Sequence, residues 1–552
     1  MKITKYVVPH LVQWPEDPQE LGELSTSYRI IRGVMRSVTD TWFREITVVD
    51  ADTIPNDRGV IFMSWHLGAM IDPLLMFSTI PGQLTFAAKH TLFKVPILGI
   101  LIKAIGAKPV FRADDIKKSE SSNSQERSNK NTGLIDTLSE VVSDGGRIAI
   151  YPEGKAHLEP HPVRVRSGTA RIILQATREA REKNLNDPII VPIGIHYTDQ
   201  HRFRERATIQ VNRKMTLPPL PGENGAPVPD EELSEKYPDD CQDRAWINEV
   251  TELIKIELHR SNHAEESWED RDLAWKTRSM VRAYRMANSG HKISRPNHSE
   301  SVLGARRVRA AWHWLRENDE DEANSLRSKM EDYNSTLSEY NLQPWEIQDR
   351  NKRKSRQDFV LNLVNFVWSY SWLFGIVTWG AMIGNLVPYY VTRILTKHVI
   401  TEAKSGSTGE GSYKLIVSFA IYPIWWILAS IGVGWILAAD SSPIQNTALP
   451  GIILPFLKLV PWTLLSLLLL VWWPLSARLH LKLWSRAVRS WRGMKRWFKL
   501  TDDSIPWENL KVSHNQLASM ISNFGDSLIL PGDSDWKEPE TGKEDWQVVN
   551  KR

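Results

Sequence analysis

A histidine and a carboxylate lie close together in residues 65–73, which read WHLGAMIDP. Neutral histidine is suited to accepting a proton near pH 7, and a carboxylate can hold its second ring nitrogen and stabilise the imidazolium that forms. His66 and Asp72 are therefore candidates for a general base and its orienting partner. Taken alone, the pair is more typical of a histidine at the end of a strand whose ring is satisfied by the backbone.

Three further segments carry residues suited to holding or shaping a substrate. The stretch 89–99 leads into GAKPVFR, which ends at Arg112, and it is followed by YPEGK at 151–155 and VPIG at 191–194. A substrate that carries a phosphate needs groups that hold it in register, and the planar guanidinium of an arginine suits phosphate. Lys89 and Lys155 are additional candidates for contacts with a phosphate or an acyl carrier, although both residues equally fit solvated surface positions.

The order and spacing of these four blocks, over about residues 60–197, resemble the glycerolipid acyltransferase superfamily. That superfamily includes glycerol-3-phosphate and lysophosphatidate acyltransferases. The resemblance implies that His66 is the catalytic base, that Asp72 orients it and that Arg112 binds the phosphate of the acceptor. The remaining matches belong to blocks that shape the acceptor side of the site: Glu153, Gly154 and Pro192.

This chain departs from the commoner family pattern at three places. Five residues separate His66 from Asp72 where four are usual, and Trp65 stands where asparagine is usual. The wider spacing, followed by Asp-Pro, is similar to fungal-type glycerol-3-phosphate and dihydroxyacetone-phosphate acyltransferases, which also carry membrane segments after the catalytic domain. Lys155 replaces the usual glycine or threonine, so we expect the choice of acceptor to depend on this position.

Strand and helix patterns alternate around the four blocks, which predicts an α/β catalytic domain followed by a helical region and C-terminal transmembrane helices. Short β-branched runs predict strands at 46–49, 60–64, 148–151 and 189–195. Apolar periodicity predicts helices at 24–38, 134–143, 168–182 and 242–260. The serine-rich, charged stretch 113–132 predicts a mobile loop beside the site.

A chain of 552 residues exceeds what one hydrophobic core supports, so we expect several regions. They are a lead-in at 1–23, the catalytic domain at 24–215, a charged and mostly helical extension at 216–357, a membrane domain at 358–477, a basic amphipathic interfacial helix at 478–500 and a polar tail at 501–552.

Three long uncharged runs, at 359–391, 415–439 and 459–477, predict an integral membrane protein. A bilayer span needs about 17 to 25 residues. The following segment, 478–500, interleaves arginine and lysine with leucine, valine and tryptophan, which is typical of a helix lying among anionic headgroups.

Basic residues before the first run and after the last place both ends on one side of the membrane, so the number of crossings should be even. We expect two full crossings, at 415–439 and 455–477, with four as the alternative. The first run should then form a re-entrant or interfacial hairpin with breaks near Gly375, or near Gly384 and Pro388.

The composition and the N-terminal sequence narrow the possible ligands and the possible location of the protein. A net charge of +4 on this length gives no argument for nucleic acid, and the single Cys241 excludes an intramolecular disulfide and a multi-cysteine metal site. Prolines and acidic residues within 9–17 argue against a cleaved signal. We expect a catalytic domain on the cytosolic face of a bacterial inner membrane or of the endoplasmic reticulum.

The expected reaction moves a fatty acyl group from acyl-CoA or acyl carrier protein to a hydroxyl of glycerol-3-phosphate or a lysophospholipid. The partners are then this thioester donor, the acceptor and membrane phospholipid, with no metal, no nucleic acid and no other cofactor. Two alternatives stay open: a remodelling lysophospholipid acyltransferase or transacylase, and a non-catalytic lipid-binding scaffold.

Overall fold

The computed structural model describes residues 3–7, 14–18, 21–22, 24–95, 98–110, 124–353, 355–373, 376–403, 409–442, 460–539 and 547–548. The chain divides into two compact units. The first unit comprises residues 1–348 together with 507–552, and the second comprises residues 349–506. The second unit is therefore inserted into the sequence of the first.

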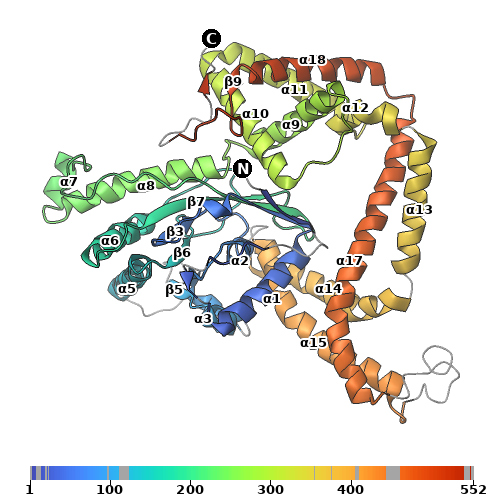
Figure 1. Ribbon diagram of the computed structural model, residues 1–552, viewed down its shortest axis with the longest axis horizontal. Helices are drawn as coiled ribbons and strands as arrows, with labels where there is room; N and C mark the ends of the chain where they lie inside the picture. Colours follow the sequence, from blue (N-terminus) through green and yellow to red (C-terminus); the bar gives the residue numbers. More distant parts are fainter. Residues whose placement is uncertain are drawn as a thin grey trace. The chain divides into compact units, whose positions relative to one another are not determined.

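An eight-stranded sheet, in the order β1-β2-β8-β7-β3-β6-β4-β5, forms the centre of the first unit (Figure 1). Its strands are β1 (Ile3–Val7), β2 (Glu45–Val49), β3 (Val60–Met63), β4 (Leu84–Lys89), β5 (Lys108–Val110), β6 (Arg147–Ile150), β7 (Ile189–Tyr197) and β8 (Arg206–Val211). The neighbours β7, β3, β6, β4 and β5 run parallel, whereas β8 is antiparallel to β7. The carboxyl ends of the five parallel strands therefore meet at one edge, where α/β proteins commonly place their sites.

Helices cover both faces of this sheet. They are α1 (Thr26–Trp42), α2 (Ile71–Thr79), α3 (Leu98–Ala104), α5 (Ser124–Ser143), α6 (Gly168–Glu182), α7 (Glu231–Lys236) and α8 (Cys241–Ser261). Ile61 and Met63 of β3 pack into one core with apolar residues of α5, α6 and α8, including Leu138, Ile173 and Ile254. All four residues of β3 are buried, as expected for a central parallel strand that is covered on both faces.

Arginine and aromatic contacts fix α1 on the sheet. The rings of Tyr28 in α1 and Phe77 in α2 lie 5.1 Å apart, and the Tyr28 hydroxyl accepts a hydrogen bond from the backbone N–H of Leu84 at 2.8 Å. Arg32 is buried and donates to the carbonyl of Ile80 and to the carboxylate of Asp17. The N-terminal helix is thereby tied to the strand and helix that follow His66.

The strands and helices expected in residues 24–260 are present, with two differences that matter for the site. α5 begins at Ser124, so 124–132 is helical rather than a loop, because this stretch holds good helix formers and no proline. The rest of the expected loop, 111–123, lies outside the described residues. β7 continues past 195 to Tyr197, two residues further along the edge of the sheet.

A helical layer completes the first unit, formed by α9 (Trp268–Asn288), α10 (His298–Asn318), α11 (Glu320–Glu339) and α12 (Pro344–Arg353), the last running across the boundary between the units. The segment expected to be a polar tail contains α18 (Trp507–Gly525), which packs against α9, α10 and α11. The hydroxyl of Tyr333 lies 2.7 Å from Nδ1 of His514, and Arg285 pairs with Asp526 at 2.6 Å.

The residues after α18 form a C-terminal clasp, which we define as residues 526–539. Arg306 of α10 binds both carboxylate oxygens of Glu538, at 3.0 and 3.1 Å, and Arg307 binds Asp533 at 2.6 Å. Arg260, in α8, donates to the carbonyl of Pro539. The last part of the chain thus ties α10 to the helices that cover the sheet.

The second unit consists of α13 (Arg356–Leu373), α14 (Ile376–Ala403), α15 (Glu410–Ala438) and α17 (Trp462–Leu500) in the part of it that is described. Among the described residues, α15 and α17 are long and apolar enough to cross a membrane. The first apolar run contains α13, which ends at Leu373, and α14, which begins at Ile376 and continues through Gly384 and Pro388. The break expected near Gly375 lies outside the described residues. The basic segment 478–500 is the second half of α17.

Polar side chains join α14, α15 and α17 within this unit. The side-chain amide of Asn385 donates to the carbonyl of Trp473 at 3.1 Å, and its oxygen accepts from the indole of Trp426 at 3.2 Å. The indole of Trp473 donates to the hydroxyl of Ser430 at 2.9 Å. Such bonds satisfy polar groups internally, as a lipid environment requires.

Three buried histidines make the stability of the first unit sensitive to acid. The rings of His196 and His263 lie 4.5 Å apart and are tilted by 37°, and Nδ1 of His298 lies 2.8 Å from the hydroxyl of Thr208. Burial, followed by the charges of Arg271 and Arg306, lowers the pKa of His196 to about 3. The pKa values of His263 and His298 are also lowered by burial.

We therefore predict that unfolding becomes easier as the pH falls below about 6.5, the ordinary histidine pKa. The unfolded chain binds protons there that the folded unit excludes, so the stabilisation is complete above pH 6.5 and is lost progressively towards pH 3. Each such histidine contributes a slope of about 1.4 kcal/mol per pH unit. Thermal midpoints in detergent at pH 7.5, 6.5 and 5.5 should fall in that order, and less steeply for His196→Gln. Equal slopes for both proteins would contradict the assignment.

Candidate active site

The loop after β3 carries His66 to the carboxyl edge of the sheet. The backbone N–H of Ser64 still bonds to the carbonyl of Ile150 in β6 at 3.3 Å, and the chain then leaves the sheet. Tyr151 and Glu153 follow β6 at the same edge, and Lys89 ends β4 there. The blocks that are far apart in the sequence are thus brought together by the parallel strands.

His66 and Asp72 form a hydrogen-bonded pair. Nδ1 of His66 lies 2.9 Å from Oδ2 of Asp72, which stands in the first turn of α2. The five intervening residues fold into a turn in which Ala69 adopts a left-handed conformation (φ 49°) and Ile71 donates to the carbonyl of Gly68 at 3.0 Å. A left-handed alanine costs about 1 kcal/mol, so the wider spacing is accommodated at a modest cost in backbone strain.

Tyr197 holds the other oxygen of this carboxylate. Its hydroxyl donates to Oδ1 of Asp72 at 2.6 Å, and the backbone N–H of Gly68 bonds to both carboxylate oxygens, at 2.9 and 3.1 Å. Burial, followed by the Asp72 charge, raises the pKa of Tyr197 well above 10, so the phenol keeps the proton it donates. A side chain at Gly68 would come within 2.6 Å of Asp72 and 3.0 Å of Tyr197, which explains the glycine.

The imidazole of His66 lies flat on Tyr151, with ring centroids 4.2 Å apart and 19° between the planes. The Asp72 side chain is fully buried, whereas the His66 side chain is 13% exposed. Because Nδ1 faces a carboxylate, this nitrogen carries the ring proton and leaves Nε2 as an acceptor. Nε2 has no hydrogen-bond partner within the part of the chain that the structure describes, so it is open to a substrate hydroxyl.

The carboxylate of Glu153 joins the two loops rather than facing open space. Its Oε2 accepts from the backbone N–H of His66 at 3.1 Å, and its Oε1 accepts from Nε2 of His157 and the N–H of Val163, both at 2.7 Å. His157 in turn donates its backbone N–H to the carbonyl of His66 at 3.2 Å. Trp65 is fully buried and meets the His157 ring edge-on at 6.3 Å.

The other residues singled out in the sequence have different surroundings. Gly154 takes a left-handed conformation (φ 71°) in the turn after Glu153, and the adjacent Lys155 is exposed. Pro192 is buried in β7, in register with Met63 of β3. Lys89 pairs through its backbone with Val110 of β5. Arg112 lies outside the described residues, two positions beyond the end of β5.

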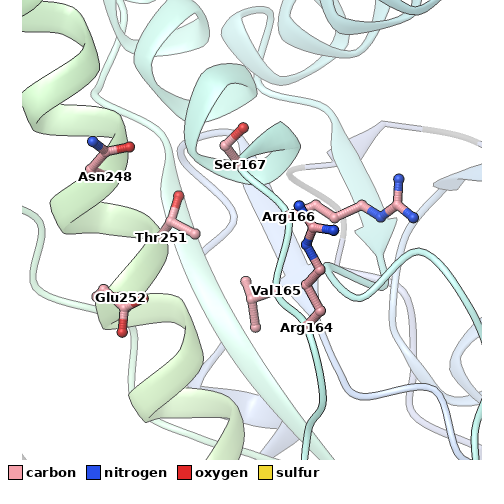
Figure 2. A pocket seen from close by; sticks show the side chains of 7 residues that line it. All are labelled: Arg164, Val165, Arg166, Ser167, Asn248, Thr251 and Glu252. Carbon is pink, nitrogen blue, oxygen red and sulfur yellow. The ribbon is translucent and has the colours of Figure 1, made fainter. Parts of the chain in front are cut away.

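A pocket of about 500 Å³ lies between residues 164–167 and α8. Figure 2 shows Asn248, Thr251 and Glu252 on α8, across from this segment, and shows the side chain of Arg166 extending away from α8. Neither His66 nor Asp72 lines this pocket. This pocket is therefore not the candidate active site, which we place instead at the open Nε2 of His66.

Sequence reasoning missed the residues that hold the pair in place. Tyr151 and Tyr197 touch His66 and Asp72 directly, and His157 is bonded to Glu153. Their positions in the sequence could have identified the two tyrosines, because Tyr151 follows β6 and Tyr197 ends β7, and both strands belong to the parallel set. Polar or aromatic residues at such strand ends lie at the edge where a site is expected.

Comparisons with known proteins match the part of the chain that contains this site. Residues 45–196 match the family described as Acyltransferase. A 1-acyl-sn-glycerol-3-phosphate acyltransferase of Borreliella burgdorferi is 26% identical over 156 residues, which are 28% of this chain and 52% of that protein. An uncharacterized acyltransferase of Schizosaccharomyces pombe is 30% identical over 74 residues, 13% of this chain and 10% of that protein. This chain thus spans about half of the first relative and a tenth of the second.

A solved structure, that of the 1-acyl-sn-glycerophosphate (LPA) acyltransferase PlsC from Thermotoga maritima, matches 42% of this chain and 79% of its own chain, with 15% identity and a TM-score of 0.26. The family match contains His66, Asp72 and Glu153, and it ends one residue before Tyr197. Over residues 45–196, the chain therefore carries a domain of the glycerolipid acyltransferase superfamily.

Proposed function

We propose that this chain transfers a fatty acyl group from a thioester donor to a hydroxyl of glycerol-3-phosphate or a lysophospholipid. The observation that carries the proposal is the pair of His66 and Asp72, 2.9 Å apart, with Nε2 of His66 open and Asp72 buried. The domain match and the name of the bacterial relative support acyl transfer in lipid synthesis.

In the proposed mechanism, Nε2 of His66 removes the proton of the acceptor hydroxyl as its oxygen attacks the carbonyl carbon of the thioester. The imidazolium is then stabilised by Asp72 through Nδ1. Collapse of the tetrahedral intermediate breaks the carbon–sulfur bond, and the imidazolium returns its proton to the leaving thiolate. The products are an ester and a free thiol, and His66 ends in its starting state.

Tyr197, Tyr151 and Glu153 position this base without contacting the reacting atoms. Tyr197 and Gly68 fix the carboxylate, Tyr151 supports the face of the imidazole, and Glu153 fixes the backbone of His66. A non-catalytic lipid-binding scaffold would not need an aligned base with an open nitrogen, which argues against that alternative.

The test is an assay of the purified protein in detergent with acyl-CoA and separate acceptors: glycerol-3-phosphate, lysophosphatidate and phosphate-free lysolipids. Products are resolved by mass. We expect a new ester on a phosphate-bearing acceptor. Transfer from a phospholipid without acyl-CoA would instead indicate a transacylase, and the absence of transfer under every condition would contradict the proposal.

Arg112 gives a prediction about the acceptor. If it binds the acceptor phosphate, Arg112→Ala should raise the KM for a phosphate-bearing acceptor more than it lowers kcat, because the contact exists in both the ground and the transition state. The KM for acyl-CoA should change less. Steady-state kinetics with each substrate varied in turn provide the measurement, and equal losses for phosphate-bearing and phosphate-free acceptors would assign Arg112 a structural role.

The two candidate membrane helices support membrane association, and we place His66 on the cytosolic face, where acyl-CoA is found. Both sequence neighbours of the second unit belong to the first unit, which favours an even number of crossings. We predict that single cysteines at positions 405 and 444, in a protein lacking Cys241, label from opposite sides of sealed vesicles. Labelling of 405 from the outer side, or of 444 from the cytosolic side alone, would overturn this arrangement.

A further inference from the structure

The loop from 152 to 166 closes on itself beside the candidate base. The backbone N–H of Arg166 donates to the carbonyl of Pro152 at 2.9 Å, so the last residue of the loop returns to its first. Inside the loop, Glu153 accepts from Val163 at 2.7 Å. These bonds fix the main chain of Arg166 relative to Glu153, whose carboxylate also holds the backbone of His66.

The guanidinium of Arg166 lies over Gly154. A Cβ atom added to Gly154 would meet Nε of Arg166 at 3.1 Å, Cδ at 3.3 Å and Cζ at 3.7 Å. Glycine at 154 therefore serves two needs, since it adopts φ 71° and leaves room for the guanidinium. Arg166 is exposed, and Figure 2 shows its side chain directed away from α8.

Within the described residues, this guanidinium has no carboxylate partner, unlike two arginines of α6. In α6, Arg178 binds Asp243 at 2.7 Å, and Arg181 binds Asp187 at 2.7 Å and also Glu223. In the described part of the chain, no carboxylate pairs with the side chain of Arg166. An arginine whose main chain is fixed and whose guanidinium has no internal anion is suited to receiving one from a ligand.

The position of Arg166 connects it to the base. The N–H of Gly154 donates to the carbonyl of Tyr151 at 2.9 Å, and the Tyr151 ring stacks on His66 at 4.2 Å. The guanidinium therefore lies over the turn that begins at Tyr151, the residue that stacks on the imidazole. A planar fork of N–H donors matches the oxygens of a phosphate in two parallel bonds.

We infer that Arg166 binds a phosphate group of a substrate whose reacting atoms lie at His66. This inference rests on the proposed acyl transfer and deepens it, because it adds a phosphate-binding cation from the loop after β6. The phosphate can belong to the acceptor, glycerol-3-phosphate or a lysophospholipid, or to the nucleotide part of acyl-CoA. The chemistry is the same in both cases, and the experiment separates them.

The test compares Arg166→Ala and Arg166→Lys with Arg171→Ala, a control that removes an exposed arginine from α6. In the acceptor arm, the acceptor is varied at saturating acyl-CoA, and lysophosphatidate is compared with monoacylglycerol, which lacks the phosphate. In the donor arm, acyl-CoA is compared with acyl-pantetheine, which lacks the nucleotide. Thermal midpoints of all variants show whether the fold is intact.

We expect Arg166→Ala to raise the KM of one phosphate-bearing substrate about tenfold or more while kcat changes little. The lysine variant should be intermediate, and the counterpart without the phosphate should be unaffected. Loss confined to lysophosphatidate assigns the acceptor, and loss confined to acyl-CoA assigns the donor. A KM equal to that of Arg171→Ala in both arms, or equal losses with and without the phosphate, would overturn the inference. If the unaltered protein transfers no acyl group, the proposed function itself fails.

Discussion

His66→Ala should reduce acyl transfer by about 10²- to 10⁴-fold, the usual contribution of a general base, while the protein stays folded and membrane-bound. The reason is geometric. Nε2 is the open nitrogen of the site, and no other imidazole stacks on Tyr151 within the described chain. The His66 side chain is only 13% exposed and its ring stacks on Tyr151, so truncation also removes some packing. Initial rates at saturating acyl-CoA and acceptor provide the measurement.

His291→Ala is a matched control, because His291 is an exposed histidine of the first unit that lies in the linker between α9 and α10. It should retain full activity. The thermal midpoint of His66→Ala shows how much stability the truncation costs, so that a loss of rate in the folded variant reports chemistry. Near-normal turnover in His66→Ala would remove the base from the proposed mechanism.

The second large effect is expected for Asp72→Asn, which keeps the size of the side chain and removes its charge. The amide can donate to Nδ1, which favours the ring tautomer that protonates Nε2, and it no longer stabilises the imidazolium. We expect a loss of about 10²-fold or more in kcat, with KM values nearly unchanged. Because the Asp72 side chain is fully buried, the thermal midpoint of Asp72→Asn has to be measured alongside its rate.

The variant Tyr197→Phe tests the orientation of the Asp72 carboxylate without changing its charge. It removes the 2.6 Å hydrogen bond to Asp72 but leaves the carboxylate and its bonds from Gly68. We expect a smaller loss than for Asp72→Asn, together with an altered dependence of kcat on pH, since the bond acts on the partner of the base. An unchanged rate in Asp72→Asn would show that a different carboxylate serves His66.

The central part of the fold and the main site residues could be predicted from local patterns. Short β-branched runs mark β3 and β6, and the apolar spacing of α6 predicts its residues 168–182. Because His66 follows β3 and Glu153 follows β6, a parallel arrangement of these strands brings the two residues together. The family resemblance supplied the roles that the pattern alone does not give.

Contacts that join distant residues could not be predicted in this way. Tyr197 reaches Asp72 across 125 positions, and its role depends on β7 lying beside β3 in the sheet. The sequence shows that the spacing between His66 and Asp72 is one residue longer than usual, but it does not show how the turn between them closes. In the structure, the turn closes because Ala69 adopts a left-handed backbone conformation. Likewise, a polar C-terminal sequence gives no sign that α18 packs against α9.

The C-terminal clasp has a consequence for the order in which the protein is made. Leu528 and Leu530 cover Ala310 and Ala311 of α10, and Phe524 packs on Trp314 with ring centroids 5.3 Å apart. These residues are translated only after the whole of the second unit, so the first unit cannot complete its packing until then. During synthesis, α10 therefore keeps an uncovered apolar surface while the apolar helices of the second unit are being made. Full activity should consequently appear only after translation has ended and the clasp has docked.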